Sequence, residues 1–431
     1  MADAVISSGT GGGSVGAQGE RIVGFWGRRG PLFGILLVNA LLGLVTLGIY
    51  RFWARTRLRQ YFWNSIEIDG DLLEYTGRGL ELFIGFLIVV AVLVPLFGGY
   101  SVLSTFLQAT TPDVFAAVNF LYFITIFWLT RYAYFRARRY RLARTVWRGI
   151  RGGQDGSAAS YAWLWFGYAV LSVITLGWAV PWMTAELQKY EVEHARFGVE
   201  NFRYDGTGKE LLRYWAPCGV VLSLVFVAAI VSTLTFWTDL QLLFDSATNL
   251  GTDPSAIDEN VETIFAWTYG LIVVAYLILI PFYIYYRIAA FRYMISSSNL
   301  SEVGFSAEFS GWRLVGYWFL YLLVLIGLIA VVTLLMTMFG AIAAFSGAEE
   351  LADPESFATV AFVSFIPVLL LLLFLPMINL LVFYYPAIRH IATTLRLTDI
   401  SSLERIVQSS RDDPRFGEGL AAALDVDVGG F

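Results

Sequence analysis

The sequence has few residues of the kinds that build disulfide, redox and metal sites. It contains one cysteine, Cys218, so neither an intrachain disulfide nor a cysteine-based metal cluster can form. Its two histidines, His194 and His390, lie far apart without zinc-ligand spacing around them, and each is predicted to be a lone surface residue. The sequence therefore predicts no cofactor and no metal.

Charged residues are also scarce. They make up 15% of the 431 residues, hydrophobic residues make up 57%, and the mean hydropathy is +0.65. This composition is too apolar for an ordinary soluble protein of this length and predicts a membrane protein. The net charge of -5 gives no support for nucleic-acid binding, and the arginine clusters are predicted to contact anionic lipid headgroups instead.

All 29 lysines and arginines lie outside three windows, 79–130, 214–286 and 314–388. Each window holds two apolar runs, and runs of about 20 residues can cross a hydrocarbon core of about 30 Å. The connections inside the windows are acidic or nearly uncharged, whereas eight arginines follow the first window within 131–151. Because cationic loops stay in the cytoplasm, this pattern predicts three helical hairpins with both chain termini cytoplasmic.

Two further apolar segments, Pro31–Trp53 and Tyr161–Trp182, have cations at both ends. They carry related motifs, VTLGIYRFW and ITLGWAVPW, 129 positions apart. A segment with both ends on one side cannot cross once, so each is predicted to be a re-entrant or interfacial TLG hairpin. The alternative is eight straight spans with a glycine kink. The motif residues are Thr46, Leu47, Gly48, Trp53, Thr175, Leu176, Gly177 and Trp182.

The residue types in the TLG motif suit a bend inside the membrane. Gly48 and Gly177 tolerate positive φ and can close a helix end. Thr46 and Thr175 can offer their hydroxyls to freed backbone groups, and tryptophans such as Trp53 favour the headgroup depth.

Short strands and a repeated cassette complete the predicted organisation. The stretches EYTG at 74–77, RYDG at 203–206 and EFSG at 308–311 each precede a hairpin, and alternating residues before them predict short cytoplasmic β-hairpins. The fold class is thus an all-α polytopic membrane protein with six transmembrane helices, two TLG hairpins and these β-hairpins. The predicted parts are a disordered tail at 1–24, membrane repeats at 25–160, 161–299 and 300–397, and a cytoplasmic tail at 398–431.

The chain from Phe25 onward resembles the YjgN family of bacterial inner-membrane proteins. The resemblance is carried by GPLFGILLVNALLGLVTLGIYRFWARTRLRQYFWNSIEIDGDLLEYTGRG, its second copy at 161–208, and the RFGEGLAAALDVDVGGF tail. The second copy has the Pro181-Trp182 pair typical of the family, where the first has Phe52-Trp53. The resemblance implies a location in the bacterial inner membrane and implies no activity.

Two functions from different classes fit these observations. The sequence has no phosphate-binding loop, no GxSxG motif and no paired carboxylates within the apolar runs, so it does not indicate an enzyme. The favoured hypothesis is a non-catalytic membrane-organising or accessory protein, and the sequence identifies no protein partner. The alternative is a transporter or channel-like protein for a neutral or lipid-like molecule, with Asn39, Asn119 and Asn379 along a polar pathway.

Overall fold

The computed structural model describes residues 21–235, 259–345, 354–411 and 420–421. The chain divides into two compact units. The first comprises Met1–Ala158, His194–Phe202 and Asn299–Phe431, and the second comprises Ala159–Glu193 and Arg203–Ser298. Most of the two long acidic connections predicted to face outward, at 236–258 and 346–353, lie outside the described residues, as does most of each predicted tail.

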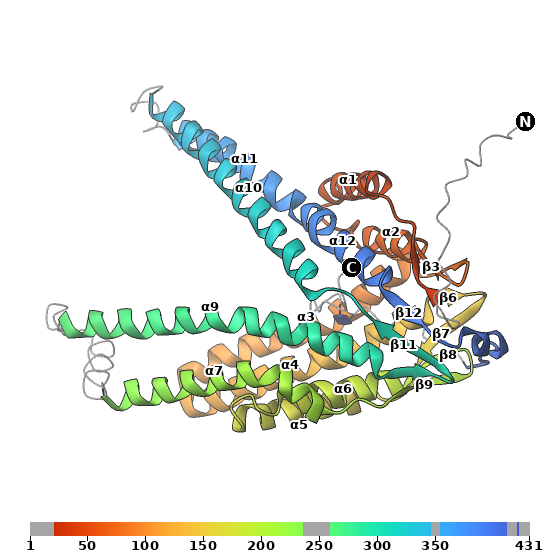
Figure 1. Cartoon of the computed structure of the whole chain (residues 1–431). Helices are drawn as coiled ribbons and strands as arrows, with labels where there is room; N and C mark the ends of the chain where they lie inside the picture. The colour runs from red at the N-terminus through yellow and green to blue at the C-terminus, as the bar shows by residue number, and fades with distance from the viewer. Residues whose placement is uncertain (1–20, 236–258, 346–353, 412–419, 422–431) are drawn as a thin grey trace, which may run out of the picture. The chain divides into compact units, whose positions relative to one another are not determined.

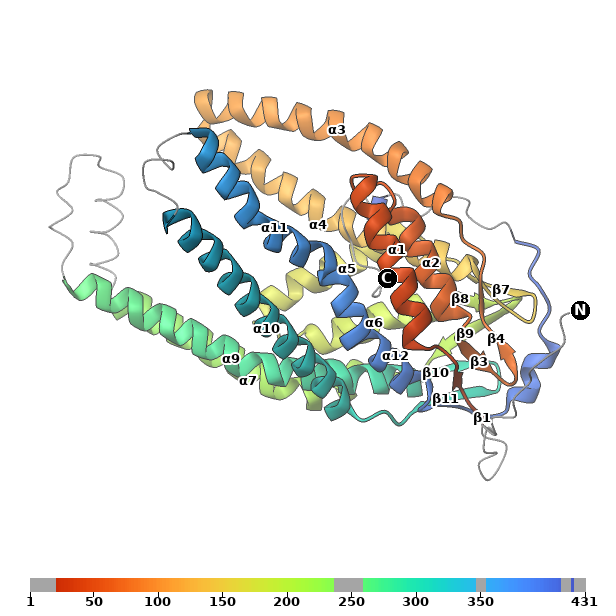
Figure 2. The ribbon, with the colours of Figure 1, turned by 90° about the horizontal axis from the view of Figure 1, so that it is seen from above.

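Helices make up most of both units (Figure 1). The first unit contains α1 (Arg29–Val45), α2 (Arg51–Trp63), α3 (Gly79–Thr110), α4 (Pro112–Ala143), α10 (Gly311–Phe345), α11 (Pro354–Asn379), a π-helix η3 (Leu380–Tyr384) and α12 (Tyr385–Ala392). The second contains α5 (Ala158–Ile174, from the last residue of unit one), α6 (Val180–Glu193), α7 (Gly208–Thr235) and α9 (Glu259–Ser296). Figures 1 and 2 both show α7 beside α9, and α10 beside α11.

Six helices in the described residues are long and apolar enough to cross a membrane, which confirms the predicted number. Among them, α3 contacts α4, α7 contacts α9, and α10 contacts α11, which η3 and α12 continue. The helices α1 and α5 are apolar but have only 17 residues each. A helix of this length rises about 25 Å, which is less than the hydrocarbon core of about 30 Å.

Twelve short strands alternate with the helices in the described residues. They are β1 (Arg21–Ile22), β2 (Gly24–Phe25), β3 (Ile66–Ile68), β4 (Asp71–Leu72), β5 (Glu74–Tyr75), β6 (Thr145–Trp147), β7 (Ile150–Gln154), β8 (Ala195–Phe197), β9 (Glu200–Tyr204), β10 (Ser298–Leu300), β11 (Val303–Ala307) and β12 (Leu395–Leu397). The β3–β4 turn has Asp69 and Gly70 at positive φ, as two-residue hairpin turns require.

The strands form two sheets that are joined end to end by the chain, and we call this closed arrangement the strand ring. One sheet has the order β1-β12-β11-β10-β9-β8-β7-β6-β5, and a second has the order β2-β3-β4. Only Val23 separates β1 from β2, and only Leu73 separates β4 from β5, so each edge of one sheet continues into an edge of the other. The sequence predicted separate β-hairpins and missed this ring, because the pairing of β1 with β12 joins residues at opposite ends of the chain. The strands at 21–25 also begin inside the segment predicted to be a disordered tail.

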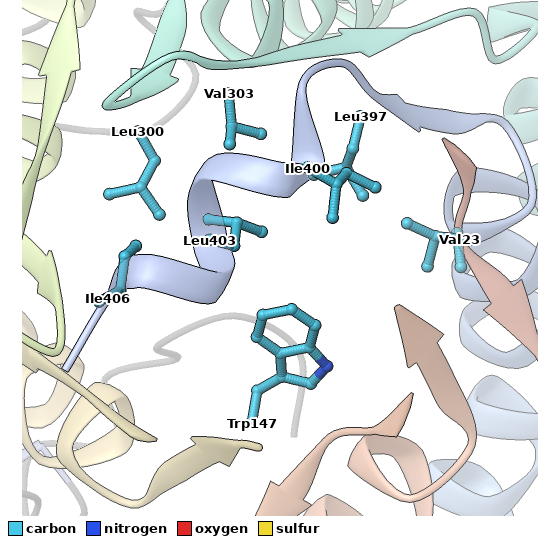
Figure 3. Packing of buried hydrophobic residues seen from close by; sticks show 9 residues of the cluster. Val23, Trp147, Leu300, Val303, Leu397, Ile400, Leu403 and Ile406 are labelled. Atoms are coloured by element: carbon cyan, nitrogen blue, oxygen red, sulfur yellow. The ribbon is translucent and has the colours of Figure 1, made fainter. Parts of the chain in front are cut away.

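A short 3₁₀-helix, η4 (Ile400–Arg405), fills the centre of the strand ring (Figure 3). Its apolar side chains pack against residues that the surrounding strands turn inward. The buried cluster consists of Val23, Trp147, Leu300, Val303, Ala392, Leu397, Ile400, Leu403 and Ile406. Figure 3 shows Leu403 between Leu300 and Trp147, with Ile400 facing Leu397. The predicted C-terminal tail therefore begins with a segment that is a structural core.

Leu403 is 7% exposed, whereas Val407, one residue beyond the cluster, is 61% exposed. We expect Leu403→Ala to lower the free energy of unfolding by about 2–5 kcal/mol, because it leaves a cavity inside the ring. The control Val407→Ala should change it by less than about 0.5 kcal/mol. Thermal unfolding of the two detergent-solubilised variants measures this difference, and equal melting temperatures would show that η4 does not support the ring.

Candidate functional site

The two TLG segments form the same helix-ending turn. After α1, the Leu47 N–H donates to Leu44 O over 3.2 Å and the Gly48 N–H donates to Gly43 O over 2.7 Å. After α5, Leu176 and Gly177 make the corresponding bonds over 3.1 and 2.6 Å. This double pattern is a Schellman cap, whose left-handed position is usually a glycine.

A leucine occupies the left-handed position in both caps. Leu47 has φ +51° and Leu176 has φ +52°, and the glycine that follows each also has a positive φ. A left-handed conformation costs a residue with a Cβ about 1–2 kcal/mol. Both motifs thus place a large apolar side chain, rather than a glycine, at the left-handed position of the turn.

The threonine of each motif satisfies backbone groups at the bend. The Thr46 hydroxyl donates to Leu42 O over 2.7 Å and accepts from the Tyr50 N–H over 3.0 Å. The Thr175 hydroxyl donates to Leu171 O over 2.8 Å and accepts from the Ala179 N–H over 3.0 Å. These bonds leave fewer polar groups in need of water, which a turn inside a membrane requires.

The tips of the two hairpins expose apolar side chains. In the first, Leu47 is 93% exposed, and its neighbours Leu44, Val45 and Ile49 are exposed as well. In the second, Val173 and Ile174 are exposed. A contiguous group of exposed large apolar residues marks a surface that contacts a membrane or another protein.

The tryptophan of each motif packs on the first glycine of the next long helix. A Cβ added at Gly79 would lie 2.8 Å from the Trp53 ring and 2.9 Å from its Cα. A Cβ added at Gly208 would lie 2.9 Å from the Trp182 ring and 2.7 Å from its Cα. Neither glycine is among the predicted site residues, although the second glycine in EYTGRG and in RYDGTG follows the tyrosine at the same spacing.

In the second unit, α6 lies along the first half of α7. Trp182 contacts the start of α7 at Gly208, whereas the Trp178 Nε1–H donates to the Ser223 hydroxyl over 2.9 Å. Gly177 faces Leu222, where an added Cβ would approach to 3.0 Å. The last cation of α7 before its apolar run is Arg213, so Ser223 lies about 15 Å further along the helix.

In each of the three hairpins, a side chain near the end of the second long helix forms a hydrogen bond with the start of the first long helix. The Tyr140 hydroxyl donates to Glu81 Oε2 over 2.6 Å, and the Thr207 N–H donates to the Tyr293 hydroxyl over 2.8 Å. In the third hairpin, the Ser310 N–H donates to His390 Nε2 over 3.1 Å. His390 is buried, so its prediction as a surface residue is wrong.

The three asparagines of the predicted polar pathway lie in different surroundings. Asn39 on α1 is 8% exposed; its Nδ2 donates to Ala54 O on α2 over 3.5 Å, and its Oδ1 has no hydrogen-bond partner among the described residues. Asn119 on α4 accepts a bond of 2.6 Å from the Tyr100 hydroxyl on α3. Asn379, half-buried, ends α11. None of the hydrogen bonds described here links these asparagines.

Charged residues of the first unit link the turns of the strand ring. Arg148 binds Asp69 and Asp71, so the β6–β7 turn is tied to the β3–β4 turn. The hydrogen bond that the Arg148 guanidinium donates to the Asp71 carboxylate raises the pKa of Arg148, and burial raises the pKa of the Tyr204 hydroxyl at the end of β9. In the described part of the chain, no three histidine, cysteine, aspartate or glutamate residues cluster as metal ligands would.

Comparison with known proteins assigns the chain to a family. The family described as "Bacterial protein of unknown function (DUF898)" matches residues 21–423. The chain belongs to this family. Within it, the chain is similar to two relatives named "Inner membrane protein YjgN", which confirms the resemblance seen in the sequence.

The relative from Salmonella typhimurium is 27% identical over 152 residues, which cover 35% of this chain and 36% of that protein. The relative from Escherichia coli K12 is 26% identical over 153 residues, which cover 36% of each chain. The chain thus spans about a third of the length of these curated relatives. No solved structure matches it. The DUF898 family carries no established activity, so the site must be interpreted from its own geometry.

The contact of Trp53 with Gly79 gives a direct test of how the first hairpin is held. We expect Gly79→Ala to destabilise the protein by about 1–3 kcal/mol, because the new methyl group overlaps the Trp53 ring and backbone. Gly98→Ala in the same helix is the matched control, since nothing lies within 4 Å of its Cβ position, and it should be neutral or slightly stabilising. Thermal unfolding in detergent compares them, and identical values would mean that the hairpin is free to move away from α3.

Proposed function

We propose that this member of the DUF898 family is a non-catalytic membrane-organising protein of the bacterial inner membrane. The observation that carries the proposal is the strand ring with its solid apolar centre. Strands of the ring precede the first helix and follow the second helix of each of the three hairpins. A ring of this kind holds elements in place, and in the described part of the chain apolar side chains occupy its centre.

The long helices support this role because they keep most of their surface available. None of the residues in the most apolar 18-residue window of α4 or of α10 is buried, and the corresponding share for α3 and α7 is 17%. The long helices therefore offer most of their apolar faces to lipids or other membrane proteins. Such surfaces fit a scaffold better than an enclosed pathway.

In this proposal the two TLG hairpins enter the inner leaflet and return. The tip of the second hairpin lies beside Ser223, about 15 Å beyond Arg213, and half of a hydrocarbon core of about 30 Å has that depth. The exposed leucine and its apolar neighbours at the first tip would then contact acyl chains. The strand ring and both termini lie in the cytoplasm, and the arginines near it contact anionic headgroups.

Spin labelling tests the insertion of the first tip. In a Cys218→Ala background, we expect a label at Leu47→Cys in proteoliposomes to be relaxed more by oxygen than by a water-soluble nickel chelate. A label at Val407→Cys, which is exposed on the ring segment, should show the reverse. Equal access of the chelate to both labels would reject membrane insertion of the TLG tip.

Asn39 favours the alternative function, a pathway for a neutral or lipid-like molecule. Its Oδ1 is buried without a hydrogen-bond partner close to the first TLG bend, and a buried unpaired acceptor costs about 1–3 kcal/mol. A pathway would give this atom a partner in the form of a passing polar group.

Lipid flux distinguishes the two functions. Vesicles with fluorescent headgroup-labelled lipid are treated with dithionite, which bleaches only lipid in the outer leaflet. The organising role predicts the same protected fraction, about half, with and without the protein. If the wild-type protein causes the protected fluorescence to be lost, and Asn39→Leu slows that loss, the transport alternative would be established instead.

A further inference from the structure

A cavity of about 360 Å³ lies where α2 meets the start of α3. It is lined by Trp53, Thr56, Arg57, Gln60 and residues 77–80. We propose that this cavity binds the phosphate of an anionic glycerophospholipid headgroup. The inference rests on the membrane placement in the proposed function and adds to it one specific lipid site.

The positive charges in the cavity are available to a ligand. Arg57 and Arg78 are both exposed, and neither forms an ion pair with a described residue. The Arg57 guanidinium carbon lies 5.6 Å from the centre of the Tyr50 ring, a contact that holds the side chain without neutralising it. The nearby Glu81 is already bound by Tyr140 and Arg144. Two free guanidiniums suit a phosphate, which accepts paired hydrogen bonds from arginine.

The remaining lining suits a lipid rather than a free phosphate. Gly77 and Gly79 pack against the rings of Tyr75 and Trp53, so the backbone on either side of Arg78 is held against the wall of the cavity. Trp53 and Leu80 add an apolar wall at the first residue of a predicted membrane span, and Leu80 is exposed. A phosphate near the arginines and acyl chains beside Leu80 would satisfy both parts of the surface. The volume lies within the range typical of small-ligand sites.

The second TLG hairpin provides an internal comparison. Its Trp182 packs on Gly208 as Trp53 packs on Gly79, so the backbone framework is shared. At the positions 129 residues after Arg57 and Arg78, however, stand Glu186 and Thr207, and the Thr207 N–H is already bound by Tyr293. The packing of the tryptophan on the glycine therefore does not require arginines at these two positions. Their presence in the first copy alone indicates binding of an anion.

Binding of short-chain lipid to the purified full-length protein tests the proposal. Isothermal titration calorimetry in non-ionic detergent would compare dihexanoyl phosphatidylglycerol, dihexanoyl phosphatidylcholine and sn-glycerol 3-phosphate. The double variant Arg57→Gln/Arg78→Gln should weaken binding of the phosphatidylglycerol about thirtyfold, from about 1 kcal/mol for each lost charge. The control is Lys189→Gln, at the position of the second copy that corresponds to Gln60.

The proposal is supported if the wild type prefers phosphatidylglycerol over both other ligands, with one site per chain, and if only the double variant loses this preference. Equal loss in Lys189→Gln would show attraction to general surface charge and overturn the site. Equal affinity for sn-glycerol 3-phosphate would overturn the assignment to a lipid. Unchanged binding by a double variant that keeps the wild-type melting temperature would overturn the role of the arginines. The assay is done in detergent, so its outcome is independent of the lipid-flux and spin-label measurements.

Discussion

Burial of the η4 side chains inside the strand ring is the interaction on which the arrangement of the chain depends. The individual strands have two to five residues, and such short strands have little stability without a packed face. The inward side chains of both sheets meet in one shared cluster. The 3₁₀-helix supplies that apolar surface with Ile400 and Leu403, and the following Ile406 extends it. The ring in turn fixes the ends of the hairpins that run out of it.

The membrane helices followed from the sequence, whereas the ring did not. Long windows without lysine or arginine are a strong local signal for membrane-spanning helices. These windows predicted the six long helices and their pairing. The turn at Asp69-Gly70 was also visible, because this dipeptide tolerates positive φ at both positions. The pairing of Arg21 with Leu397 has no local signal, because nothing near either residue specifies a partner so distant in the chain. The same reason explains why the role of residues 400–406 was missed.

The TLG motif shows how far a repeated local sequence determines a repeated structure. Both copies form the same Schellman cap with the same threonine bonds, since each of these bonds joins residues at most five positions apart. The return helices then differ, with Arg51 beginning α2 and Val180 beginning α6. The Arg51 guanidinium lies over the Phe86 ring, so even the charged return arm remains packed on its long helix. The candidate lipid pocket has no such local signal, because the fold brings Arg57 next to Arg78.

Closure of the ring has a consequence for synthesis of the protein. Strands β1 and β2 emerge first from the ribosome, but β1 pairs with β12, and η4 follows only after that strand. At translation rates of about 5–20 residues per second, the first strand edge waits roughly tens of seconds for its partner. During this interval every long helix must enter the membrane while the unfinished sheet presents open hydrogen-bonding edges to other nascent chains. A chain that stalls or is cut before residue 395 would therefore leave inserted helices with an exposed, aggregation-prone strand edge, a state that protein quality control can recognise.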